Sequence, residues 1–315
     1  KKNDNFGVFE IAMDKKREIN FLSKIIKPDV GVITNISYAH IKNFENIKGI
    51  AQAKSEIIQN IKKDGYLVLN GDDHFYNFHK KIALKMKLKI ISFSIKNKSS
   101  NIYLNLIKKE KSKYKIFVNI NNLNKYFYLS TPYENDIKNL LATIAVISIF
   151  KDINKLDSDM FYKHQIPSGR GDVSQIKLFK KNFYLIDQSY NSNPLSMYSA
   201  LKNFDMIKTK TSKKHLILGD MLELGKHSKK LHLEVVKDIN KTSIVNVNVI
   251  GKYMSGSFRS LHNNKKGSIL KNNSEIINLI KNNINNNDYL MIKGSNSTGL
   301  NKFASDIKKG KINAL

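Results

Sequence analysis

The chain has 315 residues, which predicts about two domains, and 41% of them are apolar, enough for each domain to bury a core. It contains no cysteine, which excludes a disulfide framework and a thiolate metal site. The longest apolar run, residues 140–150, is too short to cross a bilayer, and no signal peptide is visible. We therefore expect a cytoplasmic protein without an integral membrane segment.

The formal net charge of +28 raises the question of nucleic acid binding. Only Arg17, Arg170 and Arg259 are arginines, and the lysines are scattered among asparagine and isoleucine over the whole length. Nucleic-acid readers usually concentrate their charge and use arginine for bidentate contacts. We therefore expect no nucleic acid partner, and a non-catalytic basic binding protein stays open as the alternative from another functional class. We also expect a monomer.

In the first half of the chain, apolar runs alternate with amphipathic stretches. The runs predict strands at 6–13, 30–36, 66–69 and 88–94, and the amphipathic stretches predict helices at 16–26, 47–61, 74–87 and 136–150. Two alternating segments, 101–108 and 113–129, predict antiparallel strands with a turn near 121–122.

A turn cluster at 167–172 separates the two periodic halves, so we place a boundary between domains 1–168 and 169–315. The second half predicts strands at 183–187, 216–218, 245–250 and 289–292, and helices at 194–204, 228–240 and 274–285. Repeated βα units of this kind favour a second parallel sheet, so the fold class is α/β.

Polar residues follow several of the predicted strands, where α/β proteins usually bind ligands. The strand at 30–36 leads into a polar turn ending at His40, and the next helix carries Lys54. No GxGxxG and no GxxxxGK[ST] loop occurs in the chain. Four other histidines show no partner pattern and are expected at the surface: His74, His79, His164 and His262.

Taken in order, these motifs resemble the Mur ligases, a family of ATP-dependent amide-forming enzymes of peptidoglycan synthesis. Three runs carry the resemblance most strongly: DQSYNSNPLSM at 187–197, LGDMLELG at 218–225 with His232 downstream, and KGS at 293–295. The resemblance implies a central P-loop-type ATPase domain, incomplete here, with a mostly parallel sheet, helices and a few antiparallel strands. A Rossmann-like C-terminal α/β domain would follow.

The resemblance also implies which residues act. Metal binding falls to Glu10, His40 and Lys54, the last in carbamylated form, and Lys54, His40 and Arg170 would be catalytic. The nucleotide would contact Asn70, Asp72, Asn139, Arg170, Asp187 and Asn191. The substrate would contact Asn193, Ser196, Asp220, Glu223, Lys293 and Ser295. Asn193 also fits a helix N-cap, and Asp220 and Glu223 could cap a helix instead, so these alternatives stay open.

The residue types suit this chemistry. Mg²⁺ prefers oxygen ligands, so the carboxylate of Glu10 is suitable and the imidazole of His40 is a second choice. Lys54 would repel a metal ion as an ammonium, whereas a carbamate on it would attract one. Arg170 offers a fixed cationic fork that matches phosphate oxygens.

The first of the three runs resembles the branch of the family that adds D-Ala-D-Ala. The implied reaction joins this dipeptide to a UDP-MurNAc-tripeptide through an acyl phosphate, with ATP and Mg²⁺. Another amide ligase of the superfamily, such as a folylpolyglutamate-type synthetase, is the nearest alternative. It should lack the runs at 187–197 and 218–225.

Five positions depart from the family pattern: Ala12, Asn135, Asp136, Gln188 and Asn296. The N-terminal UDP-sugar-binding domain and the phosphate loop of the family are missing from the sequence. We expect the loop to lie upstream of Lys1. Because that loop supplies much of the grip on ATP, we expect the 315-residue chain alone to have little or no ligase activity.

Overall fold

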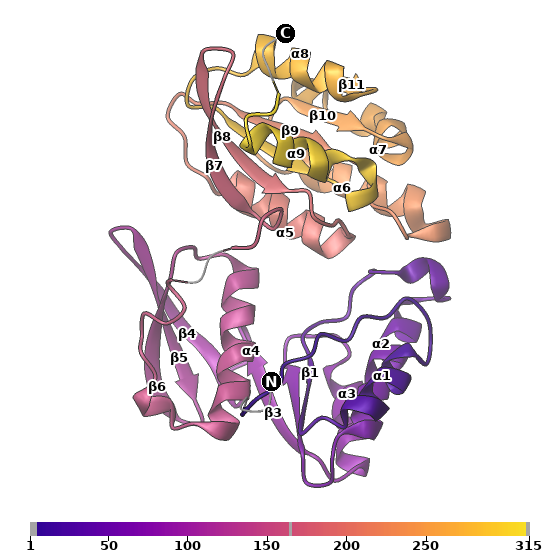
Figure 1. Cartoon of the computed structure of the whole chain (residues 1–315), viewed down its shortest axis with the longest axis vertical. Coiled ribbons are helices and arrows are strands. Elements are labelled where there is room, and N and C mark those ends of the chain that lie inside the picture. Colours follow the sequence, from indigo (N-terminus) through magenta and orange to yellow (C-terminus); the bar gives the residue numbers. More distant parts are fainter. Residues whose placement is uncertain (1–4, 164–165, 313–315) are drawn as a thin grey trace. The chain divides into compact units, whose positions relative to one another are not determined.

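The computed structural model describes residues 5–163 and 166–312, so His164 lies outside the described residues (Figure 1). The chain divides into two compact units. The first unit contains residues 1–36 and 43–164, and the second contains residues 37–42 and 165–315. Within the described residues, each unit is built around a six-stranded sheet, which agrees with the predicted α/β class.

The sheet of the first unit has its strands in sequence order. The strands are β1 (Val30–Ile33), β2 (Tyr66–Asn70), β3 (Lys89–Ser94), β4 (Ile102–Glu110), β5 (Lys113–Ile120) and β6 (Leu123–Leu129). The pairs from β1 to β4 are parallel, and β5 pairs antiparallel with both β4 and β6. The expected mostly parallel sheet with added antiparallel strands is therefore confirmed, and the turn at Asn121 and Asn122 has both residues at positive φ.

Helices cover both faces of this sheet. They are α1 (Glu18–Ile26), α2 (Ile47–Ser55), α3 (Tyr76–Lys85) and α4 (Glu134–Phe150), with the 3-10 segment η2 (Glu56–Asn60) continuing α2. Val68 of β2 is buried with the apolar side of α4, whereas Leu67 and Leu69 are buried with Ile58 of η2 and Ala83 of α3. Alternate side chains of a strand point to opposite faces, which explains why the centre of β2, residues 67–69, is apolar without interruption.

The predicted strand at residues 6–13 is wrong. This segment has no regular structure, and Phe6, Val8 and Phe9 are 57%, 97% and 66% exposed. An apolar run becomes a strand only where a neighbouring strand accepts its backbone hydrogen bonds. Among the described residues no strand pairs with it, and β1 forms the edge of the sheet.

The sheet of the second unit has the order β11-β10-β9-β12-β8-β7. Its strands are β7 (Asp172–Leu178), β8 (Lys181–Gln188), β9 (Lys214–Leu218), β10 (Val247–Ile250), β11 (Lys266–Leu270) and β12 (Tyr289–Lys293). All pairs are parallel except β7 with β8. The sequence did not predict β7, because its turn to β8 uses Phe179 and Lys180 at positive φ in place of the usual Asn-Gly. It also did not predict β11.

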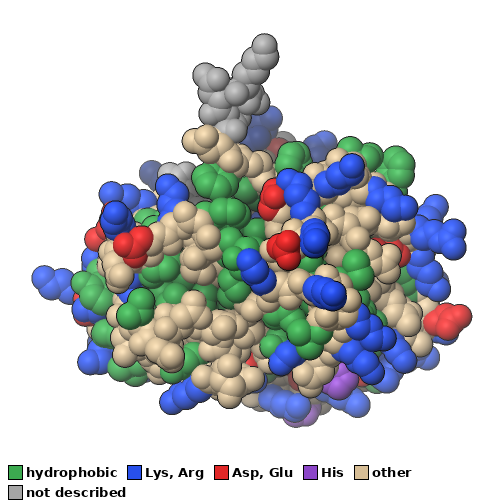
Figure 2. Space-filling view, turned by 90° about the horizontal axis from the view of Figure 1, so that it is seen from below, with side chains coloured by type: hydrophobic (Ala, Val, Ile, Leu, Met, Phe, Trp, Pro, Cys, Tyr) green, Lys and Arg blue, Asp and Glu red, His purple; other side chains and the backbone are tan. Residues whose placement is uncertain are grey.

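The helices of the second unit are α5 (Pro194–Asp205), α6 (Ser228–Asn240), α7 (Lys252–Ser257), α8 (Asn273–Asn283) and α9 (Leu300–Lys308). The apolar sides of α8 and α9 share one core with β8, β9 and β12. Among the described residues, none of the helices combines the length and apolarity needed to cross a bilayer. On the face shown in Figure 2, basic side chains are spread among apolar and uncharged ones.

Candidate functional site

Three loops of the second unit meet where neighbouring parallel strands end. They follow β8, β12 and β9, which are adjacent in the sheet, and they carry residues 188–193, 293–295 and 219–225. These loops contain the three sequence runs that carry the family resemblance. Because the carboxyl ends of parallel strands share one edge, the topology brings together motifs that are far apart in the sequence.

Lys293, at the end of β12, connects its own loop to the loop that follows β8. Its side chain is buried, and its Nζ donates hydrogen bonds to the carbonyl oxygens of Asn191 at 3.1 Å and Gln188 at 3.4 Å. Burial lowers the pKa of the Lys293 ammonium from its ordinary value of 10.5 to about 7. The buried amine therefore supports the 188–191 backbone, and a ligand on the surface would not reach it without a rearrangement.

Ser295 connects the same region to the loop after β9. Its Oγ accepts a hydrogen bond from the Leu222 amide at 2.9 Å and donates one to the Ser192 carbonyl at 3.3 Å. The Ser295 amide also donates to the carbonyl of Asp220 at 3.0 Å. Ser295 is only 5% exposed, so its hydroxyl is used for joining the three loops.

The motif after β8 contains both buried and exposed side chains. Asp187 is buried, and its Oδ1 accepts hydrogen bonds from the amide and the hydroxyl of Ser189 at 3.1 and 2.5 Å. Asn191 is exposed, and its Oδ1 accepts from the Ser192 amide at 2.7 Å. Of these two predicted nucleotide ligands, only Asn191 presents a side chain to the surface.

Asn193 and Ser196 form the start of α5. Asn193 Oδ1 accepts from the Ser196 amide at 2.9 Å, and the Asn193 amide donates to Ser196 Oγ at 3.0 Å. This is a capping box, with Pro194 at the first helical position. The N-cap alternative for Asn193 is therefore confirmed, while a substrate role for either side chain stays a prediction.

Asp220 likewise caps a helix. Its carboxylate accepts hydrogen bonds from the amides of Tyr253 and Met254 in the first turn of α7 at 2.8–3.2 Å. The neighbouring Met221 amide donates to Nε2 of His232 at 2.9 Å, and Nδ1 of His232 lies 2.6 Å from the Ser228 carbonyl. Because an amide can only donate, His232 must be neutral with its proton on Nδ1. Burial accordingly lowers the pKa of His232.

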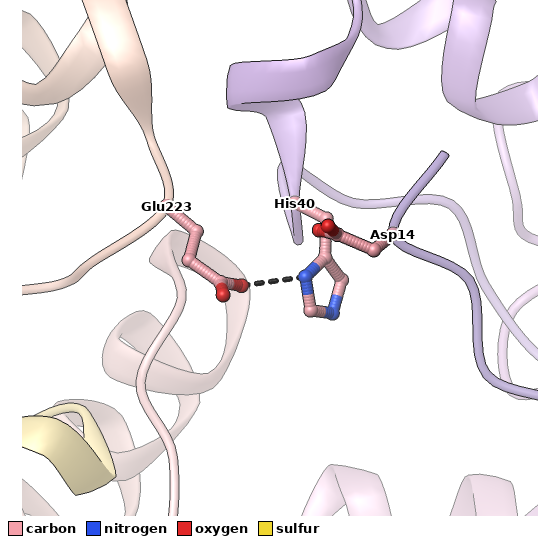
Figure 3. A group of neighbouring side chains, drawn as sticks. All are labelled: Asp14, His40 and Glu223. Carbon is pink, nitrogen blue, oxygen red and sulfur yellow. Dashed lines mark ion pairs between the residues drawn. The ribbon is translucent and has the colours of Figure 1, made fainter. Parts of the chain in front are cut away.

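Glu223 is the exposed member of the loop after β9, and it stands at a positive φ of 63°. Its Oε2 lies 2.5 Å from Nδ1 of His40 (Figure 3), and its Oε1 lies 3.6 Å from Nζ of Lys42. The Lys42 amide also donates to the Glu223 carbonyl at 3.0 Å. One nitrogen of the His40 ring therefore faces this carboxylate and could not bind a metal ion at the same time.

Arg170 lies in the turn that precedes β7. Its side chain is exposed, and its guanidinium carbon lies 4.5 Å from the ring centre of Tyr190. The Tyr190 amide donates to the Gly169 carbonyl at 3.0 Å, so the stacked pair is also joined through the backbone. This arrangement leaves the polar edge of the guanidinium available to an anion.

In the first unit, Lys54 points from α2 to the end of β1. Its Nζ donates to the carbonyl of Asn35 at 2.9 Å. Burial lowers the pKa of Lys54, and the negative charge of Asp73 opposes part of that change. Asp73 itself accepts from the amides of Ile36 at 2.7 Å and Phe75 at 2.8 Å, and so joins the loops after β1 and β2.

Asn70 and Asp72 hold the neighbouring strand ends together. Asn70 donates through Nδ2 to the Thr34 carbonyl at 3.0 Å. Asp72 accepts from the Ser94 hydroxyl at 2.5 Å and from the Ile95 amide at 2.7 Å. Both predicted nucleotide ligands therefore have bonds that shape the loops, and a nucleotide contact from either one stays a prediction.

Glu10 and Asn139 have exposed side chains, on the irregular N-terminal segment and on α4 respectively. A metal role for Glu10 and a nucleotide role for Asn139 stay predictions.

His74 and His262 are exposed as predicted, but the predicted surface position of His79 is wrong. His79 is 1% exposed, and its Nε2 lies 3.0 Å from the Ala51 carbonyl, because α3 packs its side against α2.

Sequence reasoning did not identify two residues that hold loops at the strand ends, Asp73 in the first unit and Lys308 in the second. Asp73 directly follows Asp72, to which the resemblance assigns a nucleotide contact, and no role was predicted for Asp73 itself. Lys308 lies in α9 outside every motif, and its Nζ reaches the carboxylates of Asp172 and Asp187. No sequence signal marks it among the many lysines.

Comparisons with known proteins agree with this architecture. The family model described as Mur ligase middle domain matches residues 1–147, and the one described as Mur ligase, glutamate ligase domain matches residues 174–296. A UDP-N-acetylmuramoyl-tripeptide--D-alanyl-D-alanine ligase of Buchnera aphidicola subsp. Baizongia pistaciae is 31% identical over 318 residues. That alignment covers 98% of this chain and 65% of the relative, so the chain spans about two thirds of its length.

Two solved structures have the same fold. MurF from Acinetobacter baumannii has a TM-score of 0.84 at 23% identity, covering 98% of this chain and 66% of that one. MurF ligase from Thermotoga maritima in complex with ADP has a TM-score of 0.79 at 20% identity, covering 96% and 66%. At these identities the two structures support the fold of the chain and not its specificity.

Proposed function

The chain belongs to the Mur ligase family, and from this premise we propose that the protein containing it is an ATP-dependent amide ligase that adds D-Ala-D-Ala to a UDP-MurNAc-tripeptide. The substrate carboxylate attacks the γ-phosphorus of ATP, ADP leaves, and an acyl phosphate forms. The dipeptide amine then attacks the acyl carbon, loses its proton, and phosphate leaves with the former carboxylate oxygen.

One observation carries this proposal. The runs at 187–197, 218–225 and 293–295 are joined at one edge of the second sheet through Lys293 and Ser295. The three runs that carry the family resemblance are thus joined to one another, and a chance resemblance would not require the side chains of one run to hold the backbone of another. The relative from Buchnera aphidicola bears the name of the same ligase.

Lys54 is proposed as the modified lysine. An amine reacts with CO₂ only in its unprotonated form, and burial of Lys54 lowers its pKa and so raises that fraction. As an ammonium it donates to the Asn35 carbonyl and would repel a cation. As a carbamate it would instead offer anionic oxygens near the ends of β1 and β2.

Mg²⁺ suits this donor set only with Lys54 in the carbamate form. The exposed carboxylate of Glu10 and a carbamate on Lys54 provide the hard oxygens that the ion prefers, and the imidazole of His40 would be a second choice. When bound, Mg²⁺ would neutralise charge on the ATP phosphates during transfer. Arg170 would hold phosphate oxygens with its free edge, at an exposed position beside Tyr190.

In the second unit we assign direct ligand contact to the exposed side chains, the nucleotide to Asn191 and the substrate to Glu223, and support to the buried ones. Asn191 and Glu223 are exposed, and the Glu223 carboxylate could attract the dipeptide amine. Lys293, Ser295 and Asp220 are at most 6% exposed and would act through the loops they hold. Asn193 and Ser196 would present the start of α5 to the dipeptide.

The decisive experiment measures phosphate release by the complete ligase that contains this chain. We expect release that depends on ATP, UDP-MurNAc-tripeptide and D-Ala-D-Ala together, and none when a folate and glutamate replace the last two. The 315-residue chain alone should release little or no phosphate under the same conditions. Turnover with folate and glutamate, or none with D-Ala-D-Ala, would contradict the proposal.

If the protein were instead a basic nucleic-acid-binding protein, it would bind single- or double-stranded polymer with a strong salt dependence. A filter-binding series between low and high salt separates this alternative. Arg170→Met and His40→Ala should then leave the measured affinity unchanged.

A further inference from the structure

Lys308 anchors a cluster of charges at the base of the turn that carries Arg170. It lies in the last turn of α9, and its Nζ donates to Asp187 Oδ2 at 2.6 Å, Ser168 Oγ at 2.7 Å and Asp172 Oδ2 at 2.9 Å. An ammonium has three protons, so this geometry uses all of them. The three acceptors come from the turn before β7, from β7 and from β8.

The same turn is held in one backbone conformation. The Gly169 amide donates to Asp172 Oδ1 at 2.6 Å, and the Gly171 amide donates to the Asp187 carbonyl at 2.7 Å. Both glycines have positive φ, 79° and 110°. A Cβ at Gly169 would lie 2.9 Å from Cβ of Tyr190, so other residues would not fit. Arg170 is the residue between these two glycines.

The charges make Lys308 difficult to replace. The side chain of Asp187 is 1% exposed and that of Asp172 is 21% exposed, and both carboxylates share the one ammonium. Burial alone lowers the pKa of Lys308, but the hydrogen bonds and charges of Asp172 and Asp187 outweigh it, and the pKa is raised. Lys308 is therefore charged throughout the neutral range. Without it, two neighbouring carboxylates would remain partly buried and would repel each other.

We propose that Lys308 is a positioning residue of the ligase. Its hydrogen bonds to Asp172, Asp187 and Ser168 fix the conformation of the turn 168–172. This turn then sets the direction in which the side chains of Arg170 and Tyr190 face the phosphate. Lys308 touches no substrate. The carboxylate oxygens of Asp187 accept hydrogen bonds from Ser189 and Lys308, so Asp187 acts on the nucleotide through this turn. The role of Arg170 rests on the proposed function, whereas the tether itself does not.

The first test measures the tether on the 315-residue chain by amide hydrogen exchange. In Lys308→Met, protection of the Gly169, Gly171 and Tyr190 amides should fall at least tenfold, while amides of β9 and β12 keep theirs. Lys309→Met removes the exposed lysine next in sequence and should match the wild type. Unchanged protection at the three amides in Lys308→Met would overturn the proposal.

A milder variant covers the case in which Lys308→Met does not fold. Ser168→Ala removes an exposed acceptor and no charge. It should lower protection at the same three amides about threefold and leave the β9 and β12 amides unchanged. Equal exchange in Ser168→Ala and wild type at all three amides would then count against the tether.

The second test uses the complete ligase and separates positioning from plain stability. Lys308→Met should lower kcat at least tenfold with less than a twofold change in KM for D-Ala-D-Ala. If Lys308 acts through Arg170, the double variant Lys308→Met/Arg170→Met should be no slower than Arg170→Met. If the reductions in kcat of the two single variants multiply in the double variant, the positioning role is overturned, even if amide exchange is faster in Lys308→Met. An inactive wild-type ligase would refute the proposed function, and the exchange result would still decide the tether.

Discussion

The two units place a lysine at the carboxyl edge of a parallel sheet in two different ways. Nζ of Lys54 in the first unit donates to the Asn35 carbonyl at 2.9 Å and interacts electrostatically with the carboxylate of Asp73. Lys293 of the second unit is 1% exposed, and its hydrogen bonds to the described residues all go to backbone carbonyls. Burial lowers the pKa of both amines, yet only Lys54 also interacts with a charged neighbour. A lowered pKa is therefore shared by the amine proposed to form a carbamate and by one that supports a loop, and the partners of the two amines distinguish them.

The largest effect expected from this comparison is the loss of catalysis in Lys54→Met. In the complete ligase, kcat should fall roughly 10²–10³-fold, the usual loss when an electrostatic group leaves a transfer site. Removing CO₂ and bicarbonate from the wild-type assay should lower the rate, and adding bicarbonate should restore it. Steady-state phosphate release measures both.

The matched control is Lys48→Met, because Lys48 lies on the same helix and is exposed. We expect its rate to equal that of the wild type. A fully active Lys54→Met enzyme would remove the distinction between the two lysines, since neither would then be reactive.

The next effect concerns stability and pH. Lys293 has a pKa of about 7 in the folded chain against an ordinary value of 10.5. Between these pH values the unfolded chain binds one more proton, so raising the pH should increase the free energy of unfolding by about 1.4 kcal/mol per pH unit through this residue. In Lys293→Met this contribution disappears, and the dependence of stability on pH becomes flatter by that slope.

Urea unfolding of the 315-residue chain at pH 7.5, 8.5 and 9.5 tests this expectation. Lys302→Met, which removes an exposed lysine of α9, should keep the wild-type slope. Parallel curves for Lys293→Met and wild type would mean that Lys293 is accessible to water and charged in the folded chain.

The smallest effect is the loss of a helix cap. Asp220→Ala removes a carboxylate that accepts from two amides at the start of α7, and it should lower the free energy of unfolding by about 1–2 kcal/mol. Thermal unfolding of the 315-residue chain measures the change. Glu234→Gln removes a half-exposed carboxylate 4.0 Å from Lys230 and should change stability by less than about 0.5 kcal/mol. An equal effect of the two substitutions would show that the cap adds nothing beyond a surface charge.

Most of the strands could be predicted because a buried strand requires a short run of apolar residues, which is visible in the local sequence. The cores of β2, β8, β9 and β12 are short apolar runs, and each is followed by polar residues that end the strand. The capping box of α5 was visible in the same way, from Asn193 and Pro194. Hairpin β7–β8 was not visible, because Phe179 and Lys180 adopt a turn conformation for which their types give no signal.

The family resemblance located the candidate residues but not their contacts. Lys293, Ser295 and Asp187 were expected to touch ligands, and the structure buries all three among backbone groups and other side chains. The segment 6–13 has the composition of a strand, but no strand in the described part of the chain pairs with it. Lys308 has no local signature, since its role depends on acceptors 121 to 140 residues away.

The sequence by itself determined the α/β class, the order of most elements and the family, because apolar periodicity and motif spacing are local properties of a chain. Only the tertiary structure decided which motif residues face outward and which hold the loops, because one edge of a sheet collects side chains from distant segments. Burial and hydrogen-bond partners then determine whether a lysine or a carboxylate is available for a ligand.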